Sequence, residues 1–172
     1  MTGFFKWKGH AFFSLAVRIY LGFVFLFACY HKVIHPEAFA LDIATYQILP
    51  LGLVNLMAII LPWIELVAGL MLVIGWRTRS AALLVSGMMV VFTIAISIAV
   101  YKGLDMSCGC FASQGAAEDP ISWRTIMRDS GWLLLGVYVL TFDREPIGID
   151  GWLARRRAQR RRPNSEKGAT VT

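Results

Sequence analysis

The sequence predicts an all-α membrane protein whose four transmembrane helices run up, down, up and down. Hydrophobic residues make up 57% of its 172 residues and charged residues only 16%, an apolar excess beyond that of soluble domains. Four windows are long enough for a bilayer core of roughly 30 Å, which takes about 20 apolar residues per helix. They run from 12 to 30, 51 to 76, 80 to 101 and 121 to 142. Because short connections make neighbouring helices antiparallel, these windows predict a four-helix bundle.

The first and fourth windows need separate justification. Arg18 interrupts the apolar part of the first window and no small-residue cleavage site follows at the usual distance, so we expect a retained helix rather than a signal peptide. The fourth window starts after Asp119 and Pro120, which resemble a helix start. Its first half holds three charged residues, Arg124, Arg128 and Asp129. We expect these opening turns to lie at the membrane interface, with the charges turned away from lipid.

The connection between the first two windows lies between two prolines, and Phe39, Ile43 and Tyr46 recur in it at helical spacing. This pattern predicts a short amphipathic helix on the membrane surface. No repeat or soluble domain is visible elsewhere. The expected organisation is a cytoplasmic segment at 1–11, a membrane domain at 12–142 and a basic, disordered cytoplasmic tail at 143–172.

Basic residues near helix ends predict the orientation, because they favour the cytoplasmic side. Four crossings put the larger group on one side: Lys6, Lys8, Arg77, Arg79, Arg155, Arg156, Arg157, Arg160, Arg161 and Arg162. We therefore expect a multi-pass protein of the cytoplasmic (inner) membrane with both termini in the cytoplasm. The net charge of +6 belongs mainly to the tail, which is typical of contact with anionic lipid headgroups rather than nucleic acid.

The segment "DMSCGCFA" places Cys108 and Cys110 one glycine apart, in the polar gap between the third and fourth windows. The predicted orientation puts them outside the cytoplasm, where disulfides form and persist. Cysteines at i and i+2 can approach closely enough for a small, strained disulfide, and strain makes a disulfide easier to reduce. Arg124 and Arg128 would favour the reactive thiolate, although acidic neighbours oppose them. The pattern favours a redox-active pair.

Other readings of these cysteines stay open. They could form a passive structural disulfide, or join His31 in a metal site. His35, one helical turn after His31, would be a fourth ligand, although Pro36 disfavours a helical conformation there. Cys29 is expected at the same outer level as Cys108 and Cys110. It is either a packed apolar residue or a third, resolving thiol.

Glu65 lies deep inside the second window, where a carboxylate is costly and needs a partner or a proton. Arg18 lies at a compatible depth in the first window. The expected arrangement is an Arg18–Glu65 ion pair that orients the two helices, with proton relay as the alternative. Gly69, Gly75 and Gly87 are expected at close helix contacts.

Four segments in this order resemble the MauE branch of the DoxX-like membrane proteins: "HKVIHPEAFALDIATYQILP", "PWIELVAGLMLVIGWRTRSAA", "CGCFA" and "WRTIMRD". The resemblance covers roughly residues 15 to 142. It implies a four-helix inner-membrane protein associated with thiol redox chemistry and linked to methylamine utilisation. By position, the family's signature cysteines would be Cys108 and Cys110, its acidic residue Glu65 and its loop lysine Lys32. Ala112 stands where many relatives have glycine, and Cys29 lies outside the family pattern.

The sequence therefore predicts a membrane thiol-disulfide redox component that supports oxidation or maturation of an exported partner. The expected partners are a thioredoxin-like protein or a disulfide-containing client, and the expected electron acceptor is a membrane quinone. As an enzyme, the chain would be a thiol-disulfide oxidoreductase. The alternatives are a non-catalytic assembly or accessory subunit with a structural disulfide, and a metal-handling membrane protein.

Overall fold

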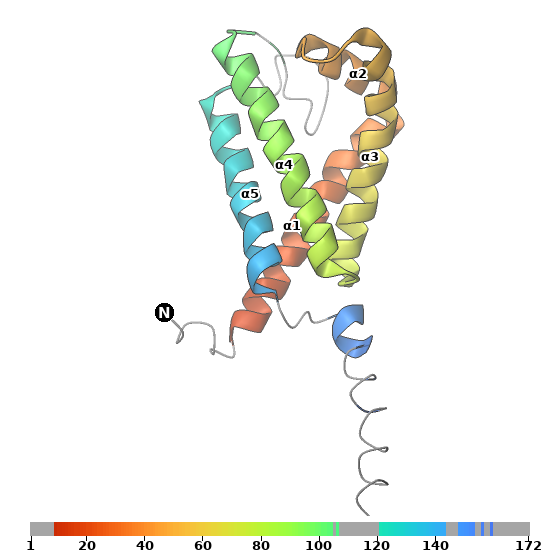
Figure 1. The fold of residues 1–172 in the computed structure, drawn as a ribbon, viewed down its shortest axis with the longest axis vertical. Helices are drawn as coiled ribbons and strands as arrows, with labels where there is room; N and C mark the ends of the chain where they lie inside the picture. The colour runs from red at the N-terminus through yellow and green to blue at the C-terminus, as the bar shows by residue number, and fades with distance from the viewer. Residues whose placement is uncertain are drawn as a thin grey trace, which may run out of the picture.

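The computed structural model of the chain describes residues 9–104, 106, 121–143, 148–153, 156 and 159. These residues form α-helices and contain no strand. The main helices are α1 (Gly9–Ile34), α2 (Pro36–Thr45), α3 (Leu51–Ile74), α4 (Thr78–Tyr101) and α5 (Trp123–Phe142). Figure 1 shows α1, α3, α4 and α5 running along the long axis, with α2 across one end. The all-α prediction is confirmed for this part of the chain.

Among the described residues, three helices are long and apolar enough to cross a membrane. They are Phe12–Ile34 within α1, Leu51–Ile74 and Thr78–Tyr101. Helix α5 is not among them, and its 20 residues include three charged ones. A fourth crossing therefore stays a prediction. The window boundaries are close to the observed helices, except that α1 continues four residues beyond the expected end, to Ile34.

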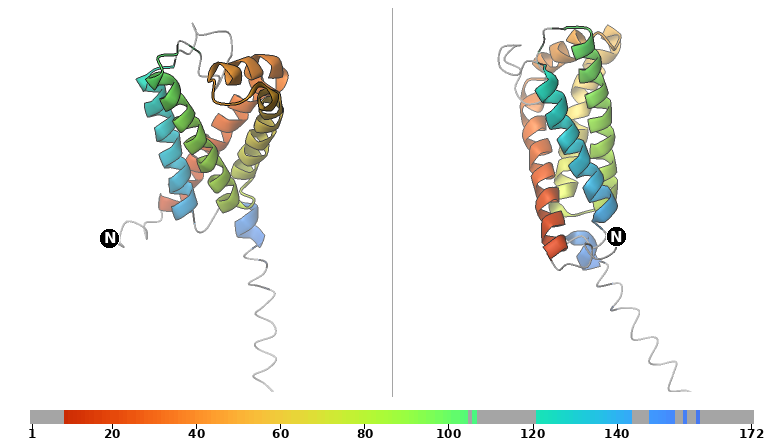
Figure 2. Two further views of the ribbon diagram at one scale, coloured as in Figure 1. Left: turned by 45° about the horizontal axis from the view of Figure 1, so that its top comes forward. Right: turned by 90° about the vertical axis from the view of Figure 1, so that its left-hand side faces the viewer.

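The segment between α1 and α3 forms the predicted short helix, α2. Pro36 occupies its first turn, where a missing N–H costs no hydrogen bond. Phe39 and Tyr46 are buried and Ile43 is half-buried. Both views in Figure 2 keep α2 at the end opposite the short helical segment 148–153. The helix is confirmed, while its place on a membrane surface stays a prediction.

Helices α1 and α3 approach closely at a pair of glycines. A Cβ added to Gly22 would lie 3.0 Å from the carbonyl oxygen of Gly69, and one added to Gly69 would lie 3.1 Å from that of Gly22. Small residues allow such contact, which gives helices packing energy in lipid. The prediction for Gly69 is confirmed. The prediction for Gly87 was wrong within the described structure, where a Cβ at this position would meet no other residue within 4 Å.

Helices α4 and α5 also pack through a small residue, since a Cβ added to Gly136 would lie 2.7 Å from Ser86 Oγ. Two apolar clusters fill the interior of the described structure. The first joins α1, α3, α4 and α5 around Leu21, Leu72, Val85 and Val139. The second lies near α2 and consists of Tyr46, Ile96, Ala99 and Met106. We call this second group the upper cluster.

The end away from α2 is closed by polar contacts. Gly75 ends α3 in the left-handed conformation, at φ 73°, which glycine adopts without strain. The segment 148–153 packs here, where the backbone N–H of Asp150 donates to the Gly75 carbonyl at 3.0 Å. The Asp150 carboxylate accepts from the backbone N–H of Thr78 at 3.0 Å and so satisfies the start of α4. Gly75 is therefore a helix cap, and it also lies at a close contact as expected, because a Cβ there would lie 3.0 Å from Nη2 of Arg18 in α1.

Candidate functional site

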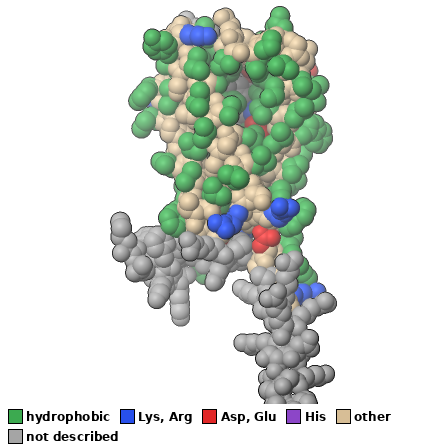
Figure 3. All heavy atoms as spheres, in the orientation of Figure 1, with side chains coloured by type: hydrophobic (Ala, Val, Ile, Leu, Met, Phe, Trp, Pro, Cys, Tyr) green, Lys and Arg blue, Asp and Glu red, His purple; other side chains and the backbone are tan. Residues whose placement is uncertain are grey.

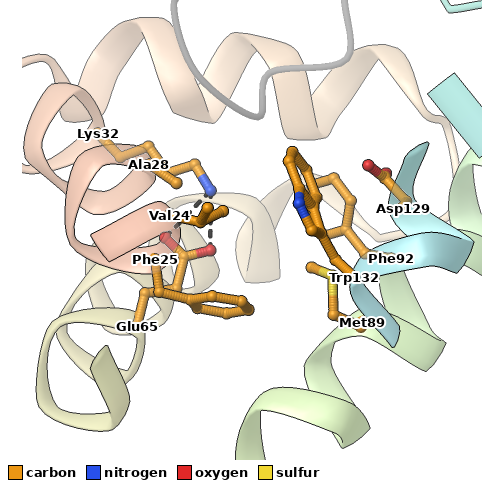
Figure 4. A pocket seen from close by; sticks show the side chains of 9 residues that line it. All are labelled: Val24, Phe25, Ala28, Lys32, Glu65, Met89, Phe92, Asp129 and Trp132. Atoms are coloured by element: carbon orange, nitrogen blue, oxygen red, sulfur yellow. Dashed lines mark hydrogen bonds and ion pairs between the residues drawn. The ribbon is translucent and has the colours of Figure 1, made fainter. Parts of the chain in front are cut away.

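Lys32 of α1 and Glu65 of α3 form a buried ion pair. Lys32 Nζ lies 2.8 Å from Oε1 and 3.1 Å from Oε2 of Glu65. The two side chains are 3% and 6% exposed. Burial of charge is costly unless the geometry is close and both partners are satisfied. Contact with both carboxylate oxygens meets that condition, and Figure 4 shows the pair at one wall of a cavity.

The directions of the two helices explain why these side chains meet. Lys32 follows Gly22 by ten residues, about 15 Å along α1, and Glu65 precedes Gly69 by four, about 6 Å along α3. Helical side chains point back toward the N-terminus of their own helix. In two antiparallel helices, Lys32 therefore reaches toward Glu65 while Glu65 reaches toward Lys32.

The expected Arg18–Glu65 pair was wrong. Arg18 is buried near the other end of α1, and its Nη1 lies 3.5 Å from Oδ2 of Asp143, just after α5. Asp143 was expected in a cytoplasmic tail, so the sequence offered Arg18 no partner there. Because Lys32 lies inside α1 instead of in a loop, it takes the place beside Glu65.

Two aromatic rings complete the surroundings of the Lys32 ammonium. Its Nζ lies 4.7 Å from the centroid of Phe39 in α2 and 5.5 Å from that of Phe92 in α4. Ring faces attract cations at such distances. One ammonium thus contacts α2, α3 and α4 from its position in α1.

A cavity lies beside the ion pair, between α1 and α3 on one side and α4 and α5 on the other. It is lined by Val24, Phe25, Ala28, Lys32, Glu65, Met89, Phe92, Asp129 and Trp132. It offers about 30 Å³ to the centres of water-sized molecules, enough for about two waters. Figure 3 shows a hollow in this face of the molecule, with side chains of both charge signs at its back.

Asp129 and Trp132 of α5 lie across the cavity from Lys32 and Glu65 (Figure 4). Asp129 is 1% exposed and its Oδ1 accepts from Arg128 Nε at 3.1 Å. The Arg128 guanidinium lies 5.0 Å from the ring centroid of Trp132. Arg124 is exposed at the start of α5. The expectation that charges in the first half of α5 turn inward therefore holds for Asp129.

Cys108 and Cys110 lie outside the described residues, but both ends of their segment are described. The backbone N–H of Ile121 donates to the Met106 carbonyl at 3.1 Å. Met106 belongs to the upper cluster, and Ile121 packs against it. We call Met106 and Ile121 the stem of the cysteine segment. The end of α4 and the start of α5, which flank the stem, lie at the same end of the molecule as α2, and α1 also ends there (Figure 1).

Cys29 is buried in α1, 2% exposed, and its Sγ lies 3.2 Å from the carbonyl oxygen of Leu26. This is the setting of a packed helical cysteine, although it lies one turn before Lys32. His31 and His35 have ring centroids 5.0 Å apart. Within the described residues, no three His, Cys, Asp or Glu side chains gather as a metal site. The set of His31, Cys108 and Cys110 extends beyond these residues and stays a prediction.

Comparison with known proteins identifies the family. Residues 10–142 match the family described as "Methylamine utilisation protein MauE". The chain belongs to the MauE family. It is 28% identical over 127 residues to "Methylamine utilization protein MauE" of Paracoccus denitrificans, covering 73% of this chain and 67% of that protein. With the protein of the same name from Methylorubrum extorquens, it shares 34% identity over 119 residues, 69% of this chain and 63% of the relative.

No solved structure matches the chain. The expected resemblance to MauE proteins is confirmed. This MauE chain spans about two thirds of the length of each of these two relatives.

Sequence reasoning missed three contributors to this region. Phe92 was not singled out, Asp129 was treated as an interfacial charge and Asp143 as part of a tail. Charge balance was a signal for Arg18 alone, because an arginine inside an apolar window requires an anion, whereas Lys32 was expected in a loop.

Proposed function

We propose that this chain is an integral membrane thiol-disulfide redox component in which Cys108 and Cys110 cycle between dithiol and disulfide. The position of the stem is the observation that best supports this proposal. It fixes both ends of the cysteine segment at one end of the helices, beside the upper cluster. Two residues of chain span at most about 7 Å, so Cys108 cannot lie far from Met106. We propose that the two cysteines act near this end of the helices.

The reaction is thiol-disulfide exchange with an exported partner. A partner thiolate attacks one sulfur of the Cys108–Cys110 disulfide and releases the other as a thiolate. The partner's second thiolate then attacks the mixed disulfide. The partner leaves oxidised, this chain is left as a dithiol, and two electrons have moved from partner to chain. Lys32, Glu65, Arg124 and Arg128 are supporting residues in this proposal, and Cys29 is a candidate third thiol.

Reoxidation requires an acceptor, for which a membrane quinone is the expectation from sequence. The cavity beside Lys32 has room for about two waters and does not fit a quinone ring. We therefore propose no electron transfer to a quinone at this cavity. A thioredoxin-like protein in its disulfide form would complete the cycle. It would take two electrons from the Cys108–Cys110 dithiol by the same kind of exchange and leave as a dithiol.

The proposed topology has four crossings with both termini in the cytoplasm, in the inner membrane. Helix α5 is the fourth crossing, and burial of Asp129 against Arg128 supports it, because a paired, inward-facing charge is tolerable within a membrane domain. The two relatives are named for methylamine utilisation. We accordingly place the exported client in that process.

Family membership equally favours an accessory subunit with no exchange of its own. Alkylation of the full chain in native membranes separates the two functions. The redox proposal expects Cys108 and Cys110 to be protected from a thiol reagent, to react after mild treatment with a dithiol, and to become protected again when a disulfide is supplied. Cys29→Ser is the matched control, because it leaves both segment cysteines in place.

A structural disulfide would resist the dithiol, and that result would contradict exchange. Cys110→Ser should accumulate a mixed disulfide with the partner through Cys108, and Cys108→Ser should abolish normal partner oxidation. Normal oxidation of the partner in Cys108→Ser would rule out the proposal. Metal bound to the purified protein, and lost in the same variant, would favour the metal-handling alternative.

A further inference from the structure

The segment 148–153 is held firmly against the turn between α3 and α4. The Asp150 carboxylate accepts from the backbone N–H of Thr78 at 3.0 Å and from its hydroxyl at 3.5 Å. Gly148 packs so closely on Gly75 that an added Cβ would lie 2.9 Å from the Gly75 Cα. The segment is therefore a built part of this end of the molecule, which is the end away from α2.

The exposed charge at this end is basic among the residues that the structure describes. The exposed charged side chains are Arg77, Arg79 and Arg156. Of the two acidic side chains described here, Asp143 is buried in an ion pair, and the Asp150 carboxylate is engaged by the start of α4. Figure 3 shows basic side chains on the surface at this end. This surface is therefore complementary to an anion.

The arginines of the α3–α4 turn lie at the depth of lipid headgroups. One helix that is long and apolar enough to cross a membrane ends at Ile74, and the next begins at Thr78. Arg77 and Arg79 therefore lie where the hydrocarbon of a bilayer gives way to its polar layer. Trp76 lies in the same turn and is 51% exposed, and tryptophan is enriched at this level of a membrane.

The docked segment adds apolar and aromatic groups beside the arginines. Ile149 and Trp152 are 42% and 52% exposed. The Arg156 guanidinium lies over Trp152, with its carbon 3.9 Å from the ring centroid. A guanidinium that stacks on a ring keeps its N–H edge for a phosphate group, which it can bind through two parallel hydrogen bonds. Apolar side chains next to such donors suit the boundary between headgroups and acyl chains.

Arg77 presents its side chain at a cost to the fold. It precedes α4 with φ 46° and ψ 45°, a left-handed conformation that glycine adopts freely and that residues with a Cβ adopt with strain. Among the described residues, no acidic side chain pairs with it. Strained residues of this kind are common where a side chain has a function.

We propose that Arg77, Arg79 and Arg156 form a binding site for the headgroup of an anionic phospholipid. Composition alone predicts lipid contact for the basic tail, whereas the structure unites a strained turn, a docked segment and a stacked arginine in one site. A zwitterionic headgroup would bring a cation to a surface that, within the described residues, exposes no carboxylate. The site lies at the end opposite the stem and does not depend on the proposed redox function.

The test follows the unfolding midpoint of the full-length protein in neutral detergent as lipid is added, because a ligand of the native state raises that midpoint. We expect phosphatidylglycerol to raise it saturably and phosphatidylcholine to raise it less. Each arginine near a lipid surface contributes about fivefold in affinity. Arg156→Gln should therefore bind about fivefold more weakly, and the double variant Arg77→Gln, Arg79→Gln about 25-fold. Lys102→Gln, at the opposite end of α4, is the matched control and should bind like the parent.

Two further comparisons separate the role of a side chain from its effect on the fold. Arg77→Gly removes the charge and the strain together. Without lipid it should unfold at a higher temperature than the parent, while its response to phosphatidylglycerol falls as far as that of Arg77→Gln. Trp152→Phe keeps a ring beneath Arg156 and should retain most of the affinity that Trp152→Ala loses.

Three results would overturn the proposal. Equal shifts with the two lipids would show that the headgroup charge is not recognised. An equal shift with inorganic phosphate alone would show a phosphate site that needs no lipid. A response to phosphatidylglycerol that persists unchanged in Arg77→Gln, Arg79→Gln would place the lipid elsewhere on the protein.

Discussion

Gly22 of α1 faces Gly69 of α3 so closely that a Cβ on either residue would lie within 3.1 Å of the other's carbonyl oxygen. This crossing sets the relative height of the two helices, and at that height the side chains of Lys32 and Glu65 reach each other. The contact between two residues without side chains is therefore part of what builds the charged site.

A larger residue at this crossing should separate α1 from α3. Gly69→Val places its Cβ 3.1 Å from the Gly22 carbonyl oxygen and from Leu26 Cγ, and overpacking of this kind costs about 1–3 kcal/mol. We expect a lower unfolding midpoint in detergent. Gly87→Val is the matched control, since a Cβ at Gly87 meets no atom within 4 Å. Equal midpoints for the two variants would contradict the close crossing.

Removing one member of the Lys32–Glu65 pair should cost more stability than removing both. Lys32→Met leaves a buried carboxylate without its ammonium, which typically costs about 3–5 kcal/mol. The double variant Lys32→Met, Glu65→Leu leaves no buried charge and should recover most of that loss. Denaturant unfolding of the detergent-solubilised chain measures both values. Additive losses from the two substitutions would show that the side chains do not depend on each other.

Asp150 should stabilise the start of α4 across a gap of 72 residues in sequence. Asp150→Ala removes the acceptor of the Thr78 N–H, and loss of such a helix-start acceptor costs about 1 kcal/mol. The segment around residue 150 should then be cut faster by a protease added to the detergent-solubilised protein. Asp150→Asn keeps an acceptor oxygen and should be cut at close to the parent rate. Unchanged cleavage in the alanine variant would argue against docking of this segment.

The fourth crossing predicts opposite accessibility for the two sides of α5. In a chain without its native cysteines, Thr45→Cys follows the first crossing, and Ile149→Cys follows α5. Both positions are exposed. An impermeant thiol reagent should label Thr45→Cys in intact cells and label Ile149→Cys only after the membrane is opened. Labelling of both variants from outside would show that α5 does not cross.

Much of the fold could be predicted because its signals are local. The apolar windows matched α3 and α4 within a few residues, and Phe39, Ile43 and Tyr46 identified α2 from spacing alone. Local pattern did not show that α1 continues to Ile34, because His31 and Lys32 have the composition of a loop. That extension places Lys32 in the helix, where its side chain points toward Glu65.

The pairing of charges could not be predicted for a related reason. The depths of Arg18 and Glu65 along their helices are compatible with an ion pair. Depth does not show which face of the helix carries each side chain, or toward which end of the molecule that side chain extends. Which acidic residue pairs with Arg18 and which with Lys32 depends on the Gly22–Gly69 crossing and on the position of Asp143 after α5. Likewise Gly87 and Gly69 are equally small, and only tertiary packing decides which of them meets another helix.

The two buried ion pairs also impose an order on how the protein is made. Helix α1 carries both cations, while their counter-charges arrive 33 and 125 residues later in synthesis. A newly inserted α1 therefore holds two unneutralised charges, which are expensive in hydrocarbon, until α3 and then the end of α5 have emerged. Helix α1 is therefore fully compensated only when the end of α5 has been made.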